Sequence, residues 1–351
     1  MFLSLQTQKE KNLYKESLAL LGKQITDTLV KGEWKNKNRL ERPITNIVVN
    51  GMGGSNLGAH IITTLLQKEL KIPVAIDPGY DVAGYVGKNT AYIVSSYSGT
   101  TEEPLVAYAK AKQRGALVIA LTALGENSLA KKARKDRIPL FQFPIDANPS
   151  KQPRLGLGAA MSGLLMILIS LNALPKNILK DLTNGSKKLA KNSKILSSNS
   201  SPARNLAKRL KGKEIVIVTG PLFAGNAQTL RNQFNESAKQ SSFFLTVSDM
   251  NHHALEGLRF PKSNKKRMVA LFIDSDLEDK KIQKRINLSQ EVFRKNKVSV
   301  INHTLIGKTK IEQSLELLQF GSYLSYYEAI INHVDPSKIP FVDWFKKKLS
   351  T

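Results

Sequence analysis

The sequence predicts an α/β protein built on two doubly wound parallel sheets. Short β-branched runs alternate with helical stretches along most of the chain, which is typical of strands joined by crossover helices. The length of 351 residues favours two domains over one. The segments IVVNGMGGSNLGAH and IVIVTGPLFAGNAQ share a strand, a glycine turn and the start of a helix, so the two halves resemble copies of one architecture.

The first half contains a helical lead-in and then a strand–helix domain. Residues 1–38 alternate charged and apolar positions at helical spacing, which predicts an amphipathic lead-in helix. The first domain is expected over residues 39–150. Its predicted strands are Ile47–Asn50, Val74–Asp77, Tyr92–Ser96, Leu117–Leu121 and Leu140–Phe143. Its predicted helices are Asn56–Glu69, Glu102–Arg114 and Ser128–Lys135.

Residues 151–212 are expected to form a linker followed by helices. The segment Leu155–Pro175 carries no charge and has about the length that spans a bilayer, roughly 20 residues. Glycine, serine and asparagine dilute its hydrophobicity, so we expect a buried helix of a globular domain and no membrane partner. The polar, lysine-rich residues 176–212 predict surface helices.

The second domain is expected over residues 213–351, where the alternation of strands and helices resumes. Its predicted strands are Glu214–Val218, Phe243–Val247, Met268–Ile273 and Val298–Asn302. Its predicted helices are Asn226–Lys239, Asp279–Lys295, Ile311–Asn332 and a short basic helix at the C-terminal end.

Charge and cysteine content restrict the classes of function. The 53 Lys and Arg exceed the 28 Asp and Glu by 25, which suits a polyanionic partner or a small phosphorylated ligand. The lysines are scattered and not clustered with aromatic residues, so compositional bias explains the charge as well and makes a nucleic-acid partner the weaker hypothesis. The absence of cysteine excludes disulfides and thiolate metal sites and is consistent with a cytoplasmic location.

Two small-residue turns follow predicted strands and suit a phosphate group. Gly51–Ser55 (GMGGS) and Ser95–Thr101 (SSYSGTT) both precede helices, so backbone N–H groups and hydroxyls would meet an anion there. Parallel sheets bind ligands at such carboxyl ends. Nucleotide motifs of the Walker A and G-x-G-x-x-G types are absent from these turns. Each turn alone also fits a structural interpretation, with Ser98 or Thr101 capping a helix that opens with two glutamates.

The motifs, taken in order, resemble those of bifunctional phosphoglucose/phosphomannose isomerases. S-x-S-G-x-T-x-E after a strand is the signature of sugar isomerase (SIS) domains. GMGGSNLG, SYSGTTEE, PRLGLG, QFNESAK, NHHALEG and DPSKIPFVDWFKKKL follow in the family's order over nearly the whole chain. The resemblance implies two SIS-type, flavodoxin-like αβα sandwich domains. It also implies isomerisation of glucose 6-phosphate, and of mannose 6-phosphate, to fructose 6-phosphate in a homodimer.

The resemblance assigns roles to nine residues and implies no cofactor or metal. Glu236 matches the base that moves a proton between C2 and C1, and His252 matches the histidine of ring opening. Arg154 matches the arginine facing the enediolate, and Lys346 aligns with a C-terminal lysine, with Lys347 as its alternative. The positions matching the phosphate site are Gly54, Ser55, Ser96, Ser98 and Thr101. The family usually reads Asn-His-Asn where this chain has Asn-His-His, and Thr100 replaces a common asparagine.

Each assignment has a structural alternative. Glu236 lies off the apolar stripe of its predicted helix and could be a solvated glutamate. The alternative for His252 is a surface histidine of a loop, and for Arg154 a surface arginine of the linker. The alternative for Lys346 is a solvated lysine in a run of charged residues. At the level of the whole protein, a non-catalytic phosphosugar sensor is the alternative to an isomerase, although no DNA-binding helix-turn-helix is evident. A pure binder would not need Glu236, His252 and Arg154 together.

Overall fold

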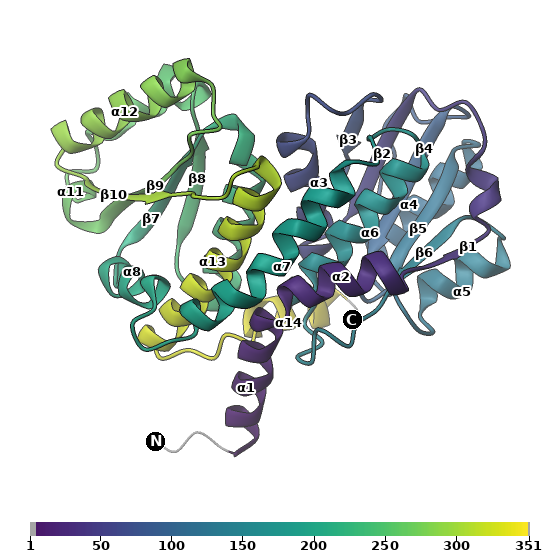
Figure 1. Cartoon of the computed structure of the whole chain (residues 1–351), viewed down its shortest axis with the longest axis horizontal. Helices are drawn as coiled ribbons and strands as arrows, with labels where there is room; N and C mark the ends of the chain where they lie inside the picture. The colour runs from purple at the N-terminus through teal and green to yellow at the C-terminus, as the bar shows by residue number, and fades with distance from the viewer. Residues whose placement is uncertain (1–4, 350–351) are drawn as a thin grey trace. The chain divides into compact units, whose positions relative to one another are not determined.

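The computed structural model describes residues 5–349, which divide into two compact units. The first unit contains residues 19–190, and the second contains residues 1–18 and 191–351. Each unit has its own parallel sheet, as Figure 1 shows by the labelled strands. All nine strands predicted from the sequence are present, and the α/β class with two sheets is confirmed.

A six-stranded sheet forms the centre of the first unit, in the order β1-β6-β5-β4-β2-β3. All its pairings are parallel except that of β1 with β6. Its strands are β1 (Glu33–Lys35), β2 (Asn46–Gly51), β3 (Val74–Ile76), β4 (Thr90–Ser96), β5 (Leu117–Ala123) and β6 (Leu140–Phe143). The chain leaves β2 toward one edge and β4 toward the other, so the carboxyl ends of these two strands mark the topological switch point.

Helices cover both faces of the first sheet. On one face, α4 (Glu102–Gln113) and α5 (Ser128–Lys135) bury Ala107, Tyr108 and Leu129 against alternate strand residues. The other layer contains α2 (Leu21–Lys31), α3 (Gly54–Leu65) and α6 (Leu157–Ser170), which pack on one another. The strands β4, β5 and β6 are buried along their whole length, as expected for a parallel sheet that helices cover on both faces.

The uncharged segment forms the buried helix α6 as predicted. Gly163 of α6 packs against Leu121 and Phe141, where an added Cβ would stand 2.8 Å from the Leu121 side chain. Gly163 therefore lets α6 approach the sheet closely, and Gly158 packs in the same way on Leu21 of α2. Within residues 5–349 the helices are all too short or too polar to traverse a bilayer.

The second unit contains a four-stranded parallel sheet in the order β10-β9-β7-β8. Its strands are β7 (Glu214–Thr219), β8 (Ser242–Thr246), β9 (Met268–Asp274) and β10 (Ser299–Thr304). On one face, α12 (Lys280–Lys295) buries Ile286 and Phe293 against β7 and β9. The remaining α-helices are α8 (Pro202–Leu210), α9 (Ala224–Gln233), α10 (Ala254–Gly257), α11 (Asn264–Arg267), α13 (Lys310–Ile331) and α14 (Pro340–Leu349).

The helix α13 is the hydrophobic centre of the second unit and packs on α8 and α9. Its buried side chains include Leu317, Leu324 and Tyr323, whose hydroxyl lies 2.7 Å from that of Ser193. Ser193 belongs to α7 (Ile178–Leu196), one of the helices expected in the lysine-rich segment. The α1 helix (Leu5–Ala19) also belongs to this unit through Tyr14, which stacks on Tyr326 of α13.

The prediction of a single helix over residues 1–38 is wrong in its last part. The lead-in consists of α1 and α2, after which Gly32 leaves the helix with extended dihedral angles. Strand β1 and a 3₁₀ turn, η1 (Lys37–Leu40), follow. Trp34 of β1 packs edge-on against Phe141 of β6 at 5.2 Å between ring centroids. A three-residue strand has no periodicity to detect, so only tertiary pairing defines it.

Candidate functional site

The GMGGS turn connects β2 to α3 at the switch point of the first sheet. Gly53 adopts φ +51° and ψ −127°, a conformation that residues with a Cβ rarely adopt. At Gly51 an added Cβ would lie 2.8 Å from the carbonyl oxygen of Ser95. The glycines thus bring the N-terminus of α3, where a helix favours an anion, close to the end of β4.

Hydroxyl groups organise the second turn, between β4 and α4. Ser96 Oγ donates to Thr101 Oγ1 at 3.1 Å and accepts the N–H of Gly99 at 3.1 Å. Ser98 Oγ accepts the N–H of Thr100 at 3.3 Å. Thr101 occupies the N-cap position of α4, but its side chain makes no capping hydrogen bond. The capping role considered for Ser98 and Thr101 is therefore not their role in this fold.

Ser55 joins the two turns directly. Its hydroxyl accepts the N–H of Tyr97 at 3.0 Å, and its carbonyl accepts the Ser95 hydroxyl at 2.8 Å. The structure thereby brings together all the residues expected at a phosphate site, on two neighbouring strand ends: Gly54, Ser55, Ser96, Ser98 and Thr101. Ser96 is buried, Ser55 and Thr101 are half-buried, and Ser98 is exposed.

Arg154 lies beside the first of these turns. It belongs to the 3₁₀ turn η2 (Pro153–Leu155), and an added Cβ on Gly54 would stand 3.2 Å from its Cα. The guanidinium Nη1 donates to Gln152 Oε1 at 3.0 Å, and the side chain is half-buried. The backbone of Arg154 thus packs on the glycine turn, while its half-buried side chain leaves the role of this residue a prediction.

Tyr97 and Asn148 hold the Arg154 segment and were not anticipated from the sequence. The Asn148 side-chain amide donates to the Tyr97 hydroxyl at 2.9 Å and to the Gln152 carbonyl at 2.9 Å. Gly156 passes so close to the Tyr97 ring that a Cβ there would overlap it. Burial raises the pKa of Tyr97, so its hydroxyl keeps its proton. The one available signal was an aromatic residue inside a hydroxyl-rich turn.

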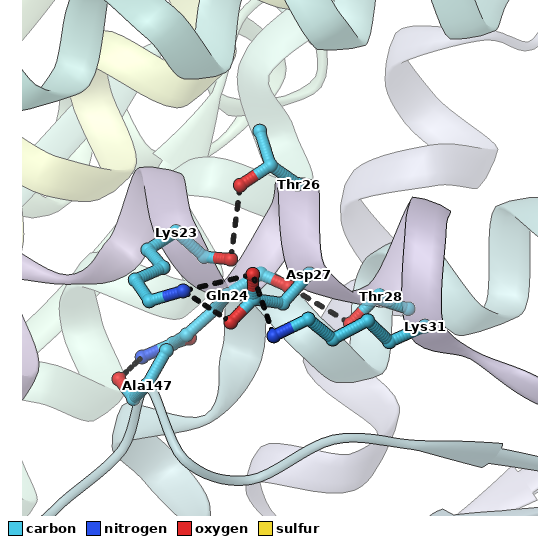
Figure 2. Close-up of polar contacts among 7 residues, drawn as sticks. All are labelled: Lys23, Gln24, Thr26, Asp27, Thr28, Lys31 and Ala147. Carbon is cyan, nitrogen blue, oxygen red and sulfur yellow. Dashed lines mark hydrogen bonds and ion pairs between the residues drawn. The ribbon is translucent and has the colours of Figure 1, made fainter.

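Gln24 of α2 fixes both ends of the same segment. As Figure 2 shows, its side chain reaches from α2 to Ala147, whose carbonyl accepts the amide at 3.2 Å. The amide also donates to the Leu155 carbonyl at 2.8 Å, and Gln24 Oε1 accepts the N–H of Gly158 at 3.2 Å. Gln24 is only 2 % exposed, so its loss would leave these backbone groups unpaired in a buried place.

Glu236 belongs to the second unit, in a π-helical turn η4 (Phe234–Ala238) that continues α9. The predicted apolar stripe of this helix is buried, whereas Glu236 is half-buried. The turn is held by the Tyr14 and Ser237 hydroxyls at 2.6 Å and by Asn332, which donates to the Ala238 carbonyl at 3.1 Å. Isolated π turns inside helices often occur at functional sites.

The two adjacent histidines have different surroundings. His252 ends the 3₁₀ turn η5 (Asp249–His252), and its side chain is exposed. His253 Nε2 lies 3.3 Å from Asp249 Oδ2. Asn251 donates to the Ser289 hydroxyl at 2.7 Å, which attaches this turn to α12. The turn therefore presents His252 outward, while His253 has a carboxylate neighbour.

Lys346 lies on α14 in the second unit, and its side chain is exposed. The nine predicted residues thus fall into two groups: the phosphate-site residues and Arg154 in the first unit, and Glu236, His252 and Lys346 in the second. Among residues 5–349 no three His, Cys, Asp or Glu side chains are arranged as a metal site.

In the second unit, the turn that corresponds to GMGGS is occupied by the carboxyl group of Glu278. Gly220 comes directly after β7, at the place where Gly51 ends β2, and Glu278 comes from the loop after the neighbouring strand β9. Glu278 Oε1 accepts the N–H of Leu222 at 3.0 Å, and a Cβ on Gly220 would overlap the carboxyl group. Burial raises the pKa of Glu278 to about 7. The two halves share their topology, but only the first has hydroxyls in place of this carboxylate.

Comparison with known proteins identifies relatives for both halves. The SIS domain family model matches residues 42–174. The model described as the bacterial phospho-glucose isomerase C-terminal SIS domain matches residues 199–349.

Similar proteins span nearly the full length. The bifunctional phosphoglucose/phosphomannose isomerase of Caldicellulosiruptor bescii is 30% identical over 346 residues, covering 95% of this chain and 98% of that protein. The protein of the same name from Thermoplasma acidophilum is 28% identical, covering 87% of this chain and 90% of that protein. Among solved structures, tagatose-6-phosphate ketose/aldose isomerase from Escherichia coli superposes with a TM-score of 0.70 at 14% identity, covering 95% of each chain. That structural similarity supports the SIS-type fold.

Proposed function

The chain belongs to the bifunctional phosphoglucose/phosphomannose isomerase family, and we propose that it interconverts glucose 6-phosphate and mannose 6-phosphate with fructose 6-phosphate. The observation that carries the proposal is the pair of hydroxyl turns joined through Ser55, with Arg154 packed against Gly54. Hydroxyls and helix N–H groups suit the phosphate of a hexose monophosphate. A cytoplasmic location belongs to the same proposal, since the chain contains no cysteine.

The proposed mechanism passes through one enediolate that the three sugars share. After phosphate binding, His252 moves a proton to the ring oxygen so that the sugar opens. Glu236 removes the proton on C2 and delivers it to C1, and a proton shifts between O1 and O2 in the same sense. Arg154 and Lys346 are positively charged and would stabilise the negative charge that develops on the enediolate oxygens.

We further propose that the protein acts as a homodimer and that His252 serves the site of the partner subunit. The exposure of His252 is consistent with a role outside its own chain. The helix α14 also exposes apolar side chains, with Phe341 at 85 % and Trp344 at 61 %. Such an exposed apolar face is typical of a surface that another protein covers.

Replacing the base tests the reaction. We expect Glu236→Gln to lower kcat by about 10³-fold or more while leaving the Kd for glucose 6-phosphate within about threefold, because the amide cannot accept the C2 proton. Formation of fructose 6-phosphate from each aldose is followed by a coupled assay, and binding by calorimetry. Glu291→Gln, an exposed site on α12, is the matched control and should retain full activity.

The outcomes separate an isomerase from a phosphosugar sensor. If the wild-type protein forms no fructose 6-phosphate from either aldose but binds both, the protein is a sensor and the proposed reaction is wrong. If Glu236→Gln retains turnover, another group is the base.

A further inference from the structure

A basic pocket lies at the amino-terminal edge of the second sheet. It is a cavity of about 250 Å³ between the segment before β9 and the end of α12, just before β10. Its cationic lining residues are Arg259, Lys262, Lys265, Lys295 and Lys297. The residues expected to act in catalysis are not part of this lining.

The charges that line the pocket are all positive. None of the lining residues is Asp or Glu, and within residues 5–349 none of the five cations forms an ion pair. The corresponding edge of the first sheet differs. There Lys112 pairs with Asp136 at 2.9 Å, and Arg134 pairs with Glu126. Other cations near that edge, Arg42 and Arg114, form no ion pair within residues 5–349 and donate to backbone carbonyls. What distinguishes the second edge is that its cations without counter-ions line one cavity.

Helix ends account for two of these cations, one of which is Lys265 in the last turn of the short helix α11. Lys295 lies in the last turn of α12, where a positive charge interacts favourably with the helix dipole. Lys297 lies beyond that helix with φ +62°, and Arg259 and Lys262 lie in turns. The helix dipole therefore does not explain why these three residues line the same cavity.

Hydrogen bonds fix the backbone on both sides of the pocket. Asn264 is 7 % exposed, and its side-chain amide donates to the carbonyls of Leu258 at 3.3 Å and Phe260 at 3.0 Å. The N–H of Lys297 donates to the Arg294 carbonyl at 2.9 Å, which closes the end of α12. The lysine and arginine side chains therefore extend from fixed backbone positions toward one concave place.

We propose that this pocket binds a small anion carrying two or more phosphoryl groups. Five cations far exceed the charge of a single phosphate, and lysines are suited to phosphate oxygens as point charges. The volume is below the roughly 300 to 1,000 Å³ of pockets for larger organic ligands, which favours a compact anion. A nucleic-acid strand would need an extended groove with several stacking aromatic residues. Beside the pocket, the exposed aromatic ring is that of Phe260, and the ammonium of Lys262 lies 4.5 Å from its centroid.

Calorimetric titration with pyrophosphate and with tripolyphosphate tests the proposal. The full-length protein is titrated at physiological salt with glucose 6-phosphate present, which occupies the phosphosugar turns. We expect one pyrophosphate per chain, bound at least tenfold more tightly than orthophosphate. The triple variant Lys262→Gln, Lys265→Gln, Lys297→Gln should weaken binding at least tenfold while leaving the isomerase kcat/KM within twofold.

A matched control removes the same charge from the other end of α12. The variant Lys280→Gln, Lys281→Gln, Lys284→Gln changes three exposed lysines outside the pocket and should bind pyrophosphate as the wild-type protein does. Equal loss in both triple variants, unchanged binding in the pocket variant, or no binding by the wild-type protein would each overturn the proposal. So would tighter binding of single-stranded DNA that both variants weaken equally. If the pocket triple variant does not fold, Lys262→Gln alone should still weaken binding.

Discussion

At the scale of single residues, the most unusual group is the carboxyl of Glu328. This residue of α13 is fully buried, and among the described residues neither carboxyl oxygen has a hydrogen-bond partner. Burial raises its pKa from 4.5 to about 7. Between pH 4.5 and about pH 7, Glu328 is therefore mostly protonated in the folded protein but mostly ionised in the unfolded chain.

The contribution of Glu328 to the stability of the protein should consequently fall as the pH rises. Because the pKa of Glu328 is higher in the folded protein, the protonated acid stabilises the fold below pH 4.5. This stabilisation is lost as the pH rises to about 7 and beyond, and it amounts to about 3 kcal/mol of unfolding free energy. Glu328→Gln cannot ionise, so we expect its free energy of unfolding to change less between pH 5 and pH 8.5 than that of the wild-type protein. Urea unfolding at both pH values measures the difference. Identical pH dependence in both proteins would show that Glu328 stays charged when folded.

At the scale of elements, the turn between β4 and α4 depends on one glycine. Gly99 has φ +68°, and an added Cβ would overlap the side chain of Asn127, the N-cap residue of α5. In this tight turn the Ser96 hydroxyl accepts the Gly99 N–H and donates to the Thr101 hydroxyl. A side chain at this position would displace the turn as a whole.

We expect Gly99→Ala to raise the KM for glucose 6-phosphate at least tenfold, because the displaced turn no longer presents its hydroxyls to the phosphate. Gly125→Ala is the matched control. Gly125 has φ +113°, so alanine is strained there as well, but a Cβ would meet no atom within 4 Å. Steady-state kinetics and thermal unfolding of both variants separate the two effects. A KM that rises equally in both variants would indicate a loss of stability alone.

Some helices, strands and turns of this fold could be predicted from the sequence, and others could not. The apolar runs that form β2, β4 and β5 and the stripe of α9 are locally periodic, so their type and position were predictable. The π turn around Glu236 was not, because it depends on Tyr14 and Asn332, which are remote in the sequence. The hydroxyl turns could be predicted from composition. The hydrogen bonds that join Tyr97 to Asn148, and Gln24 to the Arg154 segment, connect residues far apart in the sequence, so they exist only after the chain has folded.

At the scale of the whole molecule, the proposed homodimer predicts complementation between inactive variants. If His252 serves the partner's site, mixing Glu236→Gln with His252→Ala under subunit exchange creates hybrid dimers with one intact site. Random pairing restores about a quarter of wild-type activity, because half of the dimers are hybrids. Activity of the mixture is measured against each variant alone. No recovery, with exchange verified by labelled subunits, would place His252 in the site of its own chain.

The carboxylate of Glu278 makes the two halves of the chain unequal. Gly220 and Gly51 stand at the carboxyl ends of equivalent strands, but the N–H of Leu222 already donates to the Glu278 carboxyl group. An anion could bind at this turn only by displacing the Glu278 side chain, which lies where a Cβ on Gly220 would stand. The proposed binding of the sugar phosphate would therefore fall to the first half alone, because in the second half an acid of the protein already fills the equivalent place.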